Sequence, residues 1–267
     1  MHIATIVVGS IKVFIRSFFV LGFLQWFNFW FIAHRECEIK IDTIRMFIRG
    51  GRFHRKVVDM FVAIYCIIDR EYFPKGFEIK STDTVVDIGG HIGSFTLAAA
   101  REAREGKVYT FEPDALNFGM LKKNIELNRF SNVTLVNQAI GARTEERVFY
   151  RNELNDSSSS FTRVVGAGFT IRTSSLADAF ATHMIERCDF MKMDCEGSEY
   201  EIMFSTPDEV FSKIMKIAIE VHDARYFNLS PEMNNEEALL KRLHVLGYKT
   251  RVVKETTLHD LVFAWRE

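Results

Sequence analysis

One stretch constrains the fold more than any other, residues 84–95, with the sequence TVVDIGGHIGSF. A short β-branched run ends in the acid Asp87, and a turn with three glycines follows it. Residues 95–105 are rich in alanine and leucine and predict a helix. A strand, a tight turn and a helix in this order form the first unit of an α/β nucleotide-binding sheet, whose ligands lie at the carboxyl ends of the strands.

The spacing of the glycines distinguishes between two cofactors. A dinucleotide-binding turn has glycines at positions i, i+2 and i+5, and with Gly90 and Gly93 as the last two, Ile88 replaces the first. An acid at the end of the strand, two residues before Gly89, is instead typical of enzymes that use S-adenosylmethionine (SAM) and resembles motif I of class I methyltransferases. We expect the glycines to let backbone N–H groups approach the ligand. The residues predicted to contact the cofactor here are Asp87, Gly89, Gly90, His91, Gly93 and Phe95.

A second acid, Glu112, follows the next predicted strand, residues 107–111. One carboxylate can accept hydrogen bonds from both hydroxyls of a nucleoside ribose, and its charge strengthens each bond. The alternative is that Glu112 caps the helix predicted over 115–128, but Asp114 is the better N-cap. We therefore predict that Glu112 and Pro113 contact the cofactor.

The third predicted strand, residues 133–137, leads to Gln138, whose amide can both donate to and accept from an adenine edge. Gln138 is the last residue in the predicted cofactor set. Simple alternation of strands and helices then stops, and the polar loop at 155–160 either covers the pocket or is solvated. Further predicted elements are strands at 147–150 and 169–172 and a helix that Ser174 or Ser175 caps and that runs through Thr182.

Acidic residues gather after two later strands. The strand predicted over 188–194 ends in Asp194, and Glu196 follows in the next turn. The strand at 217–222 places Glu220 and His222 on one face, because side chains in a strand alternate with a period of two. We predict that these four side chains form the catalytic set, where His222 is a candidate base or ligand.

The two ends of the chain differ in character. Residues 236–246 predict a helix, and 248–254 and 261–265 predict an antiparallel hairpin, which fits a methyltransferase sheet better than an all-parallel dehydrogenase sheet. Near the amino end, residues 38–48 predict extended segments, and 56–69 predict a helix that ends before Pro74.

The segment 17–33 is uncharged and rich in phenylalanine. Its 17 residues reach only the lower limit for a membrane-spanning helix. A helical wheel places four polar residues on one narrow stripe. Three interpretations stay open: a membrane anchor or interfacial helix within residues 11–33, packing on the domain or on a partner, and a targeting segment. The polar residues of that stripe are Ser10, Ser17, Gln25 and Asn28.

Length and composition set the remaining bounds. With 267 residues, of which 48% are hydrophobic, the chain can bury one sizeable core. We divide it into a hydrophobic segment (1–40), a lead-in (41–83) and a catalytic domain (84–267). A formal net charge of −1 gives no electrostatic case for nucleic acid as a partner. The four cysteines have no metal or disulfide spacing and predict reduced core thiols in a cytoplasmic protein, namely Cys37, Cys66, Cys188 and Cys195.

Taken together, these motifs resemble the FkbM family of SAM-dependent methyltransferases. The resemblance covers about 72–248 and rests on VVDIGGHIGSFTL, FEPD, LKKNIELN, DFMKMDCEGSE and IEVH in that order, with Gly90 and His91 where alanine and asparagine are usual. It implies a Rossmann-like α/β fold with a seven-stranded, mostly parallel class I sheet. It also implies SAM as the methyl donor and O-methylation of a hydroxyl on a sugar, glycan or secondary metabolite.

The mechanistic hypothesis places Asp194, Glu196, Glu220 and His222 around the acceptor, with His222 or Asp194 taking its proton. Alternatively, these oxygens and the imidazole hold a magnesium, calcium or manganese ion, unless Lys192 and local N–H groups satisfy the carboxylates instead. Two other functions are weighed: a membrane-associated binding protein without activity, and an NAD-dependent oxidoreductase. The oligomeric state is not predicted.

Overall fold

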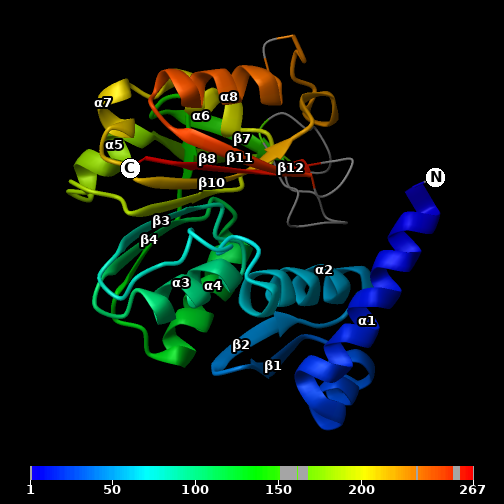
Figure 1. Ribbon diagram of the computed structural model, residues 1–267. Coiled ribbons are helices and arrows are strands. Elements are labelled where there is room, and N and C mark those ends of the chain that lie inside the picture. The colour runs from blue at the N-terminus through cyan, green and yellow to red at the C-terminus, as the bar shows by residue number, and fades with distance from the viewer. Residues whose placement is uncertain (1, 151–160, 162–167, 233, 255–258, 267) are drawn as a thin grey trace.

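The computed structural model describes residues 2–150, 161, 168–232, 234–254 and 259–266 (Figure 1). The predicted loop at 155–160 lies outside these residues. A seven-stranded sheet forms the centre, in the order β11-β12-β10-β9-β3-β4-β5. Its strands are β3 (Thr84–Ile88), β4 (Lys107–Phe111), β5 (Val133–Val136), β9 (Phe190–Met193), β10 (Lys216–His222), β11 (Lys249–Lys254) and β12 (His259–Trp265).

Five neighbouring strands of this sheet are parallel, and β12 runs antiparallel to both β10 and β11. The predicted class I sheet with its antiparallel terminal hairpin is therefore confirmed. The strand order reverses between β3 and β9, since β4 and β5 follow β3 outward on one side while β9 and β10 follow on the other. Ligand sites of open α/β sheets lie at such a switch point.

Helices cover both faces of the sheet (Figure 1). An apolar core lies on each face of the sheet. Successive side chains of a strand point into opposite cores, as those of Val85 and Val86 do. On one face lie α3 (Ser94–Glu102) and α4 (Ala115–Asn128), and on the other lie α5 (Leu176–Thr182), α6 (Glu199–Ser205), α7 (Asp208–Phe211) and α8 (Glu236–Val245). Asp114 caps α4 through the N–H groups of Leu116 and Asn117, as predicted.

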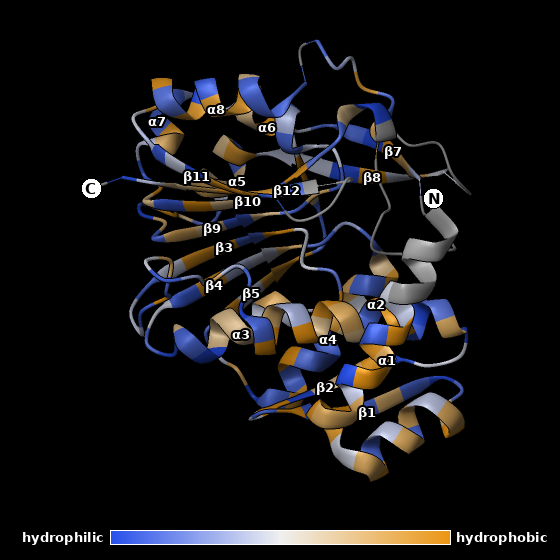
Figure 2. Cartoon of the chain, turned by 45° about the vertical axis from the view of Figure 1, so that its right-hand side comes forward, coloured by the Kyte–Doolittle hydropathy of each residue, from blue (hydrophilic) through white to orange (hydrophobic). Residues whose placement is uncertain are grey.

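The chain before β3 packs beside α3 and α4 (Figures 1 and 2). The predicted extended segments form a hairpin, and the helix predicted over 56–69 begins earlier and ends in a wider π-turn. Asn124 of α4 holds the hairpin, since its side chain accepts from the N–H of Phe47 and donates to the carbonyl of Phe47. The elements here are α1 (His2–Phe27), η1 (Asn28–Ile32), β1 (Glu36–Ile41), β2 (Ile44–Arg49), α2 (Phe53–Ala63) and η2 (Ile64–Asp69).

A three-stranded sheet interrupts the alternation after β5. It consists of β6 (Ala139–Gly141), β7 (Glu146–Tyr150) and β8 (Gly168–Ser175), in the order β6-β8-β7. Strand β6 was not predicted, and Ser175, one of the two proposed caps, caps α5 by accepting from the N–H of Asp178. A short turn η4 (Ala224–Phe227) follows β10.

The four cysteines are free thiols. Cys37, Cys66 and Cys188 are buried, which agrees with the predicted role in filling the core, whereas Cys195 is half-buried. Cys66 and Cys195 also reach the wall of a central cavity.

Candidate functional site

The glycine turn after β3 is shaped by close backbone contacts. Gly89 has a φ of +85°, and a Cβ at this position would overlap the carbonyl oxygen of Asp194. The N–H groups of Gly89 and Gly90 both donate to the carbonyl of Phe111 at 3.0 Å. These two N–H groups are therefore already accepted by the backbone of β4. The glycines let β3, β4 and β9 approach one another.

Glu112 ends β4 and faces this turn. Its Oε2 accepts from the backbone N–H of His91 at 2.8 Å, and its Oε1 accepts from the N–H of Asp114 at 2.9 Å. The side chain is buried, and burial raises the pKa of Glu112 to about 8. The side chain of Asn117 also hydrogen-bonds this carboxyl, and the acceptor capacity that remains can take a hydrogen bond from a ligand hydroxyl.

His91 has a φ of +48°, which is uncommon outside glycine. Its Nε2 lies 2.8 Å from Nη2 of Arg49, and Arg49 is fixed by Asp59. Burial and the guanidinium of Arg49 lower the pKa of His91 well below its ordinary value, so the ring is neutral. Because the guanidinium can only donate, Nε2 accepts and Nδ1 carries the hydrogen. Nδ1 has no hydrogen-bond partner among the described residues.

Lys192 of β9 connects the glycine turn to the carboxylates of Asp87 and Asp194. Lys192 donates to the carbonyl of Gly89 at 2.7 Å and lies 3.4 Å from Oδ1 of Asp87 and from Oδ2 of Asp194. Burial alone would lower the pKa of Lys192, but the carboxylates of Asp194 and Asp87 raise it, so the ammonium group stays charged. Asp87 also accepts from Thr96. It lies beneath the turn and holds its shape.

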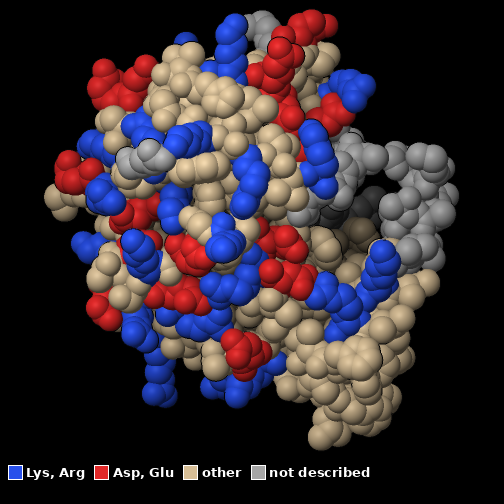
Figure 3. Space-filling view, in the orientation of Figure 1, with Lys and Arg blue, Asp and Glu red and all other residues tan. Residues whose placement is uncertain are grey.

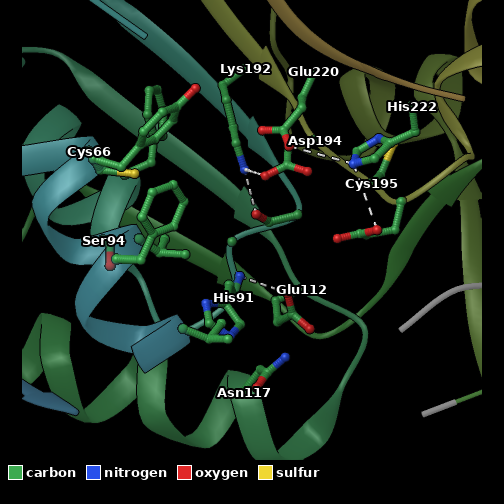
Figure 4. A pocket seen from close by; sticks show the side chains of 18 of the residues that line it. Cys66, His91, Ser94, Glu112, Asn117, Lys192, Asp194, Cys195, Glu220 and His222 are labelled. Carbon is green, nitrogen blue, oxygen red and sulfur yellow. Dashed lines mark hydrogen bonds and ion pairs between the residues drawn. The ribbon is translucent and has the colours of Figure 1, made fainter. Parts of the chain in front are cut away.

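The predicted acids come together at the ends of β9 and β10 (Figure 4). The hydroxyl of Tyr72 donates to Glu220 at 2.8 Å and lies 3.4 Å from Oδ2 of Asp194. Nε2 of His222 lies 3.7 Å from Glu196 and 3.6 Å from Glu220. One ligand atom each from Asp194, Glu220 and His222 lie within 4.8 Å of one another, a spacing that can hold a metal ion.

His222 is held from behind by Glu199. Its Nδ1 lies 2.9 Å from Oε1 of this buried carboxylate. Burial opposes a charge on the imidazole, but Glu199, Glu196 and Glu220 outweigh it and raise the pKa of His222 well above its ordinary value. Burial likewise raises the pKa of Glu196. The surrounding carboxylates therefore favour the protonated, cationic form of His222.

One cavity of about 620 Å³ joins the glycine turn to this cluster. Ten of the thirteen predicted site residues line it: Gly89, Gly90, His91, Phe95, Glu112, Pro113, Asp194, Glu196, Glu220 and His222. Three do not. Asp87 is buried under the turn, Gly93 packs against Leu121 as the N-cap of α3, and Gln138 lies in the bend before β6, while Ile140 of β6 reaches the wall.

Two wall residues that bear on the chemistry were not predicted from the sequence. Tyr72 precedes the first motif in a segment without any signal of its own, and Asn117 was treated only as part of a helix. Arg49, which fixes His91, was also missed. Lys192 was noted only as a neighbour, although a lysine inside an apolar strand is a detectable signal.

The residues fit the cofactor predicted from the motif. Glu112 supplies a buried acceptor for a ribose diol, and Nδ1 of His91 supplies a donor for a carboxylate at the turn. The fold and the site define a class I, SAM-dependent methyltransferase. The Methyltransferase FkbM domain matches residues 87–250, and the chain belongs to this family.

The chain is also similar to individual relatives and to a solved structure. The chain is 27% identical over 187 residues to the 31-O-demethyl-FK506 methyltransferase FkbM of Streptomyces tacrolimicus, covering 58% of this chain and 71% of that one. It is 23% identical over 195 residues to the AMB antimetabolite synthetase AmbE of Pseudomonas aeruginosa, covering 59% of this chain and 9% of that one. M. jannaschii TYW2 in complex with AdoMet aligns with a TM-score of 0.45 and 16% identity, over 87% and 86% of the two chains.

Proposed function

We propose that this methyltransferase transfers its methyl group to a hydroxyl oxygen, on a sugar, glycan or secondary metabolite. The observation that carries the proposal is the cluster of Asp194, Glu220 and Tyr72 in the same cavity as the glycine turn. A hydroxyl must lose a proton during transfer, and a carboxylate within hydrogen-bond reach can accept it. The name of the relative from Streptomyces tacrolimicus also describes an O-demethyl compound as that enzyme's substrate.

In this proposal SAM, when bound, supplies an electrophilic methyl group. Glu112 would hold its ribose, and His91 with the glycine turn would hold its amino-acid end. Asp194 is the proton acceptor, because its side chain is 27% exposed against 13% for Glu220, and its contact with the Tyr72 hydroxyl is longer, 3.4 Å against 2.8 Å. Lys192 keeps Asp194 in place through its charge. His222 orients Glu196 and Glu220 at the far side of the acceptor.

The test measures label transfer from methyl-labelled SAM to hydroxylated acceptors, with amine and thiol analogues of each acceptor alongside. We expect hydroxyl acceptors to be methylated, and we expect Asp194→Asn to bind SAM within a few fold of the wild type while turnover falls about 10²- to 10⁴-fold. Transfer to amines or thiols alone, or unchanged turnover in Asp194→Asn, would contradict the proposal.

A further inference from the structure

The apolar amino-terminal stretch is a helical hairpin. The backbone of α1 breaks at Gly22, where φ is +70° and ψ is 164°. Trp26 Nε1 donates to the carbonyl of Phe14 at 3.0 Å, and Trp30 Nε1 donates to Oγ of Ser17 at 2.9 Å. These bonds hold residues 23–32 against the preceding arm. The stretch Gly9–Ile32 is long and apolar enough to cross a membrane, but the break at Gly22 makes it two arms instead of one straight rod.

The polar side chains of this hairpin face the protein. Ser17 is fully buried, Gln25 accepts from the N–H of Lys40 at 2.8 Å, and Asn28 donates to Sγ of Cys37 at 3.2 Å. Three of the four residues in the polar stripe predicted from the sequence therefore attach the hairpin to β1 or to its own second arm. The hairpin is fixed to the domain by its polar side, so its orientation on the domain is determined.

The apolar side chains face outward. Phe19 and Leu24 are 80% and 82% exposed, which is unusual for such large side chains. Figures 2 and 3 show this surface as the apolar, uncharged projection at the lower right, and we call it the apolar ridge. It consists of Ile11, Ile15, Phe18, Phe19, Phe23, Leu24, Phe27, Phe31 and Ile32.

Among the described residues, unpaired cations border the ridge, whereas Arg16 of α1 is paired with Asp69. Residues 1–35 contain no acid, and Lys12 and Arg35 are exposed. Arg52 is exposed at the start of α2, where the ring of Phe53 packs against Trp30. The next acids in the sequence are neutralised, since Glu36 pairs with Lys123 and Glu38 pairs with Arg45. A large apolar surface bordered by cations complements an anionic lipid surface.

The inner side of the same hairpin lines the catalytic cavity. Val13 of α1 and Val57, Val58, Phe61 and Val62 of α2 form an apolar stretch of its wall, which Lys12, Arg16 and His54 border. The acids at the ends of β9 and β10 lie in the same cavity. A sugar without an apolar substituent would leave this stretch largely uncovered. An alcohol with an apolar chain would place the chain along α1 and α2 and its hydroxyl at the acids.

We propose that the apolar ridge docks on the surface of an anionic lipid bilayer, and that the acceptor is an amphiphilic alcohol whose apolar chain lies against the α1–α2 wall. The docking part of the proposal is independent of the proposed function, because it is argued from the ridge and the charges beside it. The acceptor part rests on the proposed function, because it assumes that a hydroxyl is methylated at Asp194.

Docking is tested by co-flotation of the full chain with vesicles. We expect binding to vesicles of phosphatidylcholine mixed with phosphatidylglycerol, weaker binding to phosphatidylcholine alone, and release by salt. The double variant Phe19→Ser, Leu24→Ser should bind at least about tenfold more weakly. The matched control, Met184→Ser with Val245→Ser, removes apolar side chains that are 80% and 71% exposed elsewhere, and should bind as the wild type does.

Three results would overturn docking. One is a wild-type chain that co-floats with neither kind of vesicle. Another is equal loss of binding in the ridge variant and its control. The third is a wild-type dimer in solution that the ridge variant converts to a monomer while vesicle binding is absent, since the ridge would then be covered by a second copy of this chain.

The acceptor class is tested by calorimetry with alkyl glucosides of increasing chain length, so that the readout does not depend on turnover. We expect affinity to rise with chain length in the wild type. Val58→Trp should weaken binding of the long-chain glucosides about tenfold and leave SAM affinity unchanged, and Val245→Trp should change neither. Affinity independent of chain length, with SAM binding intact, would overturn the acceptor class alone. Loss of SAM binding by the wild type would instead overturn the proposed function.

Discussion

Nδ1 of His222 lies 2.9 Å from Oε1 of Glu199, a fully buried carboxylate that also accepts from the N–H groups of Cys195 and Gly197. Glu199 therefore does two things at once. It fixes the loop after β9, and it stabilises the positive charge on the imidazole that faces Glu196 and Glu220.

The first prediction concerns Glu199→Gln. The pKa of His222 should fall, because Glu199 is the carboxylate that raises it most, and the variant should lose about 1–3 kcal/mol of folding free energy. In the wild type, the stability that comes from the raised pKa of His222 is fully present below pH 6.5, its ordinary pKa, and is lost as the pH rises through the folded-state pKa. Titration of the His222 ring protons by NMR and denaturant unfolding at several pH values measure both effects.

Glu201→Gln is the matched control on the same helix, since Glu201 is 29% exposed and pairs with Arg147. Its effect on the pKa of His222 should be small. An unchanged His222 titration in Glu199→Gln would show that Glu199 does not set the charge of the imidazole.

A second prediction concerns pH and SAM binding. The pKa of Glu112 is raised to about 8, so much of this carboxyl is protonated at neutral pH in the free protein. A ribose diol that donates to Glu112 favours the anion, so SAM affinity should rise with pH and level off above about pH 8, by at most tenfold per pH unit. The amino group of SAM titrates in the same pH range. In the variant Glu112→Gln only the amino group titrates, so this variant measures its contribution separately. A pH dependence of the same size in Glu112→Gln would remove Glu112 from the ribose site.

A third prediction uses two glycines. Gly89→Ala should destabilise the fold by roughly 3 kcal/mol or more and abolish SAM binding, because its Cβ would overlap the carbonyl of Asp194 at a positive φ. Gly119→Ala in α4 is the control, since nothing lies within 4 Å of a Cβ there, and it should stabilise the fold by about 0.5–1 kcal/mol. Thermal unfolding with and without SAM measures both. Similar behaviour of the two variants would mean that the turn is not constrained as described.

A fourth prediction concerns metal. Asp194, Glu220 and His222 are spaced to hold a divalent ion, but protein groups already contact them: Lys192 lies 3.4 Å from Asp194, His222 lies 3.6 Å from Glu220, and Tyr72 donates to Glu220. The cluster is therefore charge-compensated by protein groups, and we expect turnover to survive dialysis against EDTA. A loss of more than about tenfold that magnesium, calcium or manganese restores would show that the ion acts on the acceptor hydroxyl.

The sequence predicted what is encoded locally. The turn after β3, the acid that ends β4 and the alternation that pairs Glu220 with His222 each depend on a few consecutive residues and on the period of a strand. The terminal hairpin followed from its two strands in the same way. These features placed ten predicted residues around one cavity.

What the sequence did not predict depends on packing between distant segments. Tyr72 reaches Glu220, and Arg49 reaches His91, across separations of 148 and 42 residues. The N–H groups of Gly89 and Gly90 donate to the carbonyl of Phe111. The position of that carbonyl is set by the packing of β4 beside β3, and no local sequence pattern predicts it. The hairpin at Gly22 likewise involves contacts between separate segments, since Trp26 donates to Phe14 and Trp30 donates to Ser17 of the opposite arm.

The most direct test of the central claim is equilibrium calorimetry of the wild type and Glu112→Ala with SAM and with NAD. We predict that the wild type binds SAM and not NAD, and that Glu112→Ala weakens SAM binding by at least about tenfold, since the buried hydrogen-bond acceptor for the ribose is lost. Equal affinity of the two proteins for SAM, or binding of NAD in its place, would contradict the account.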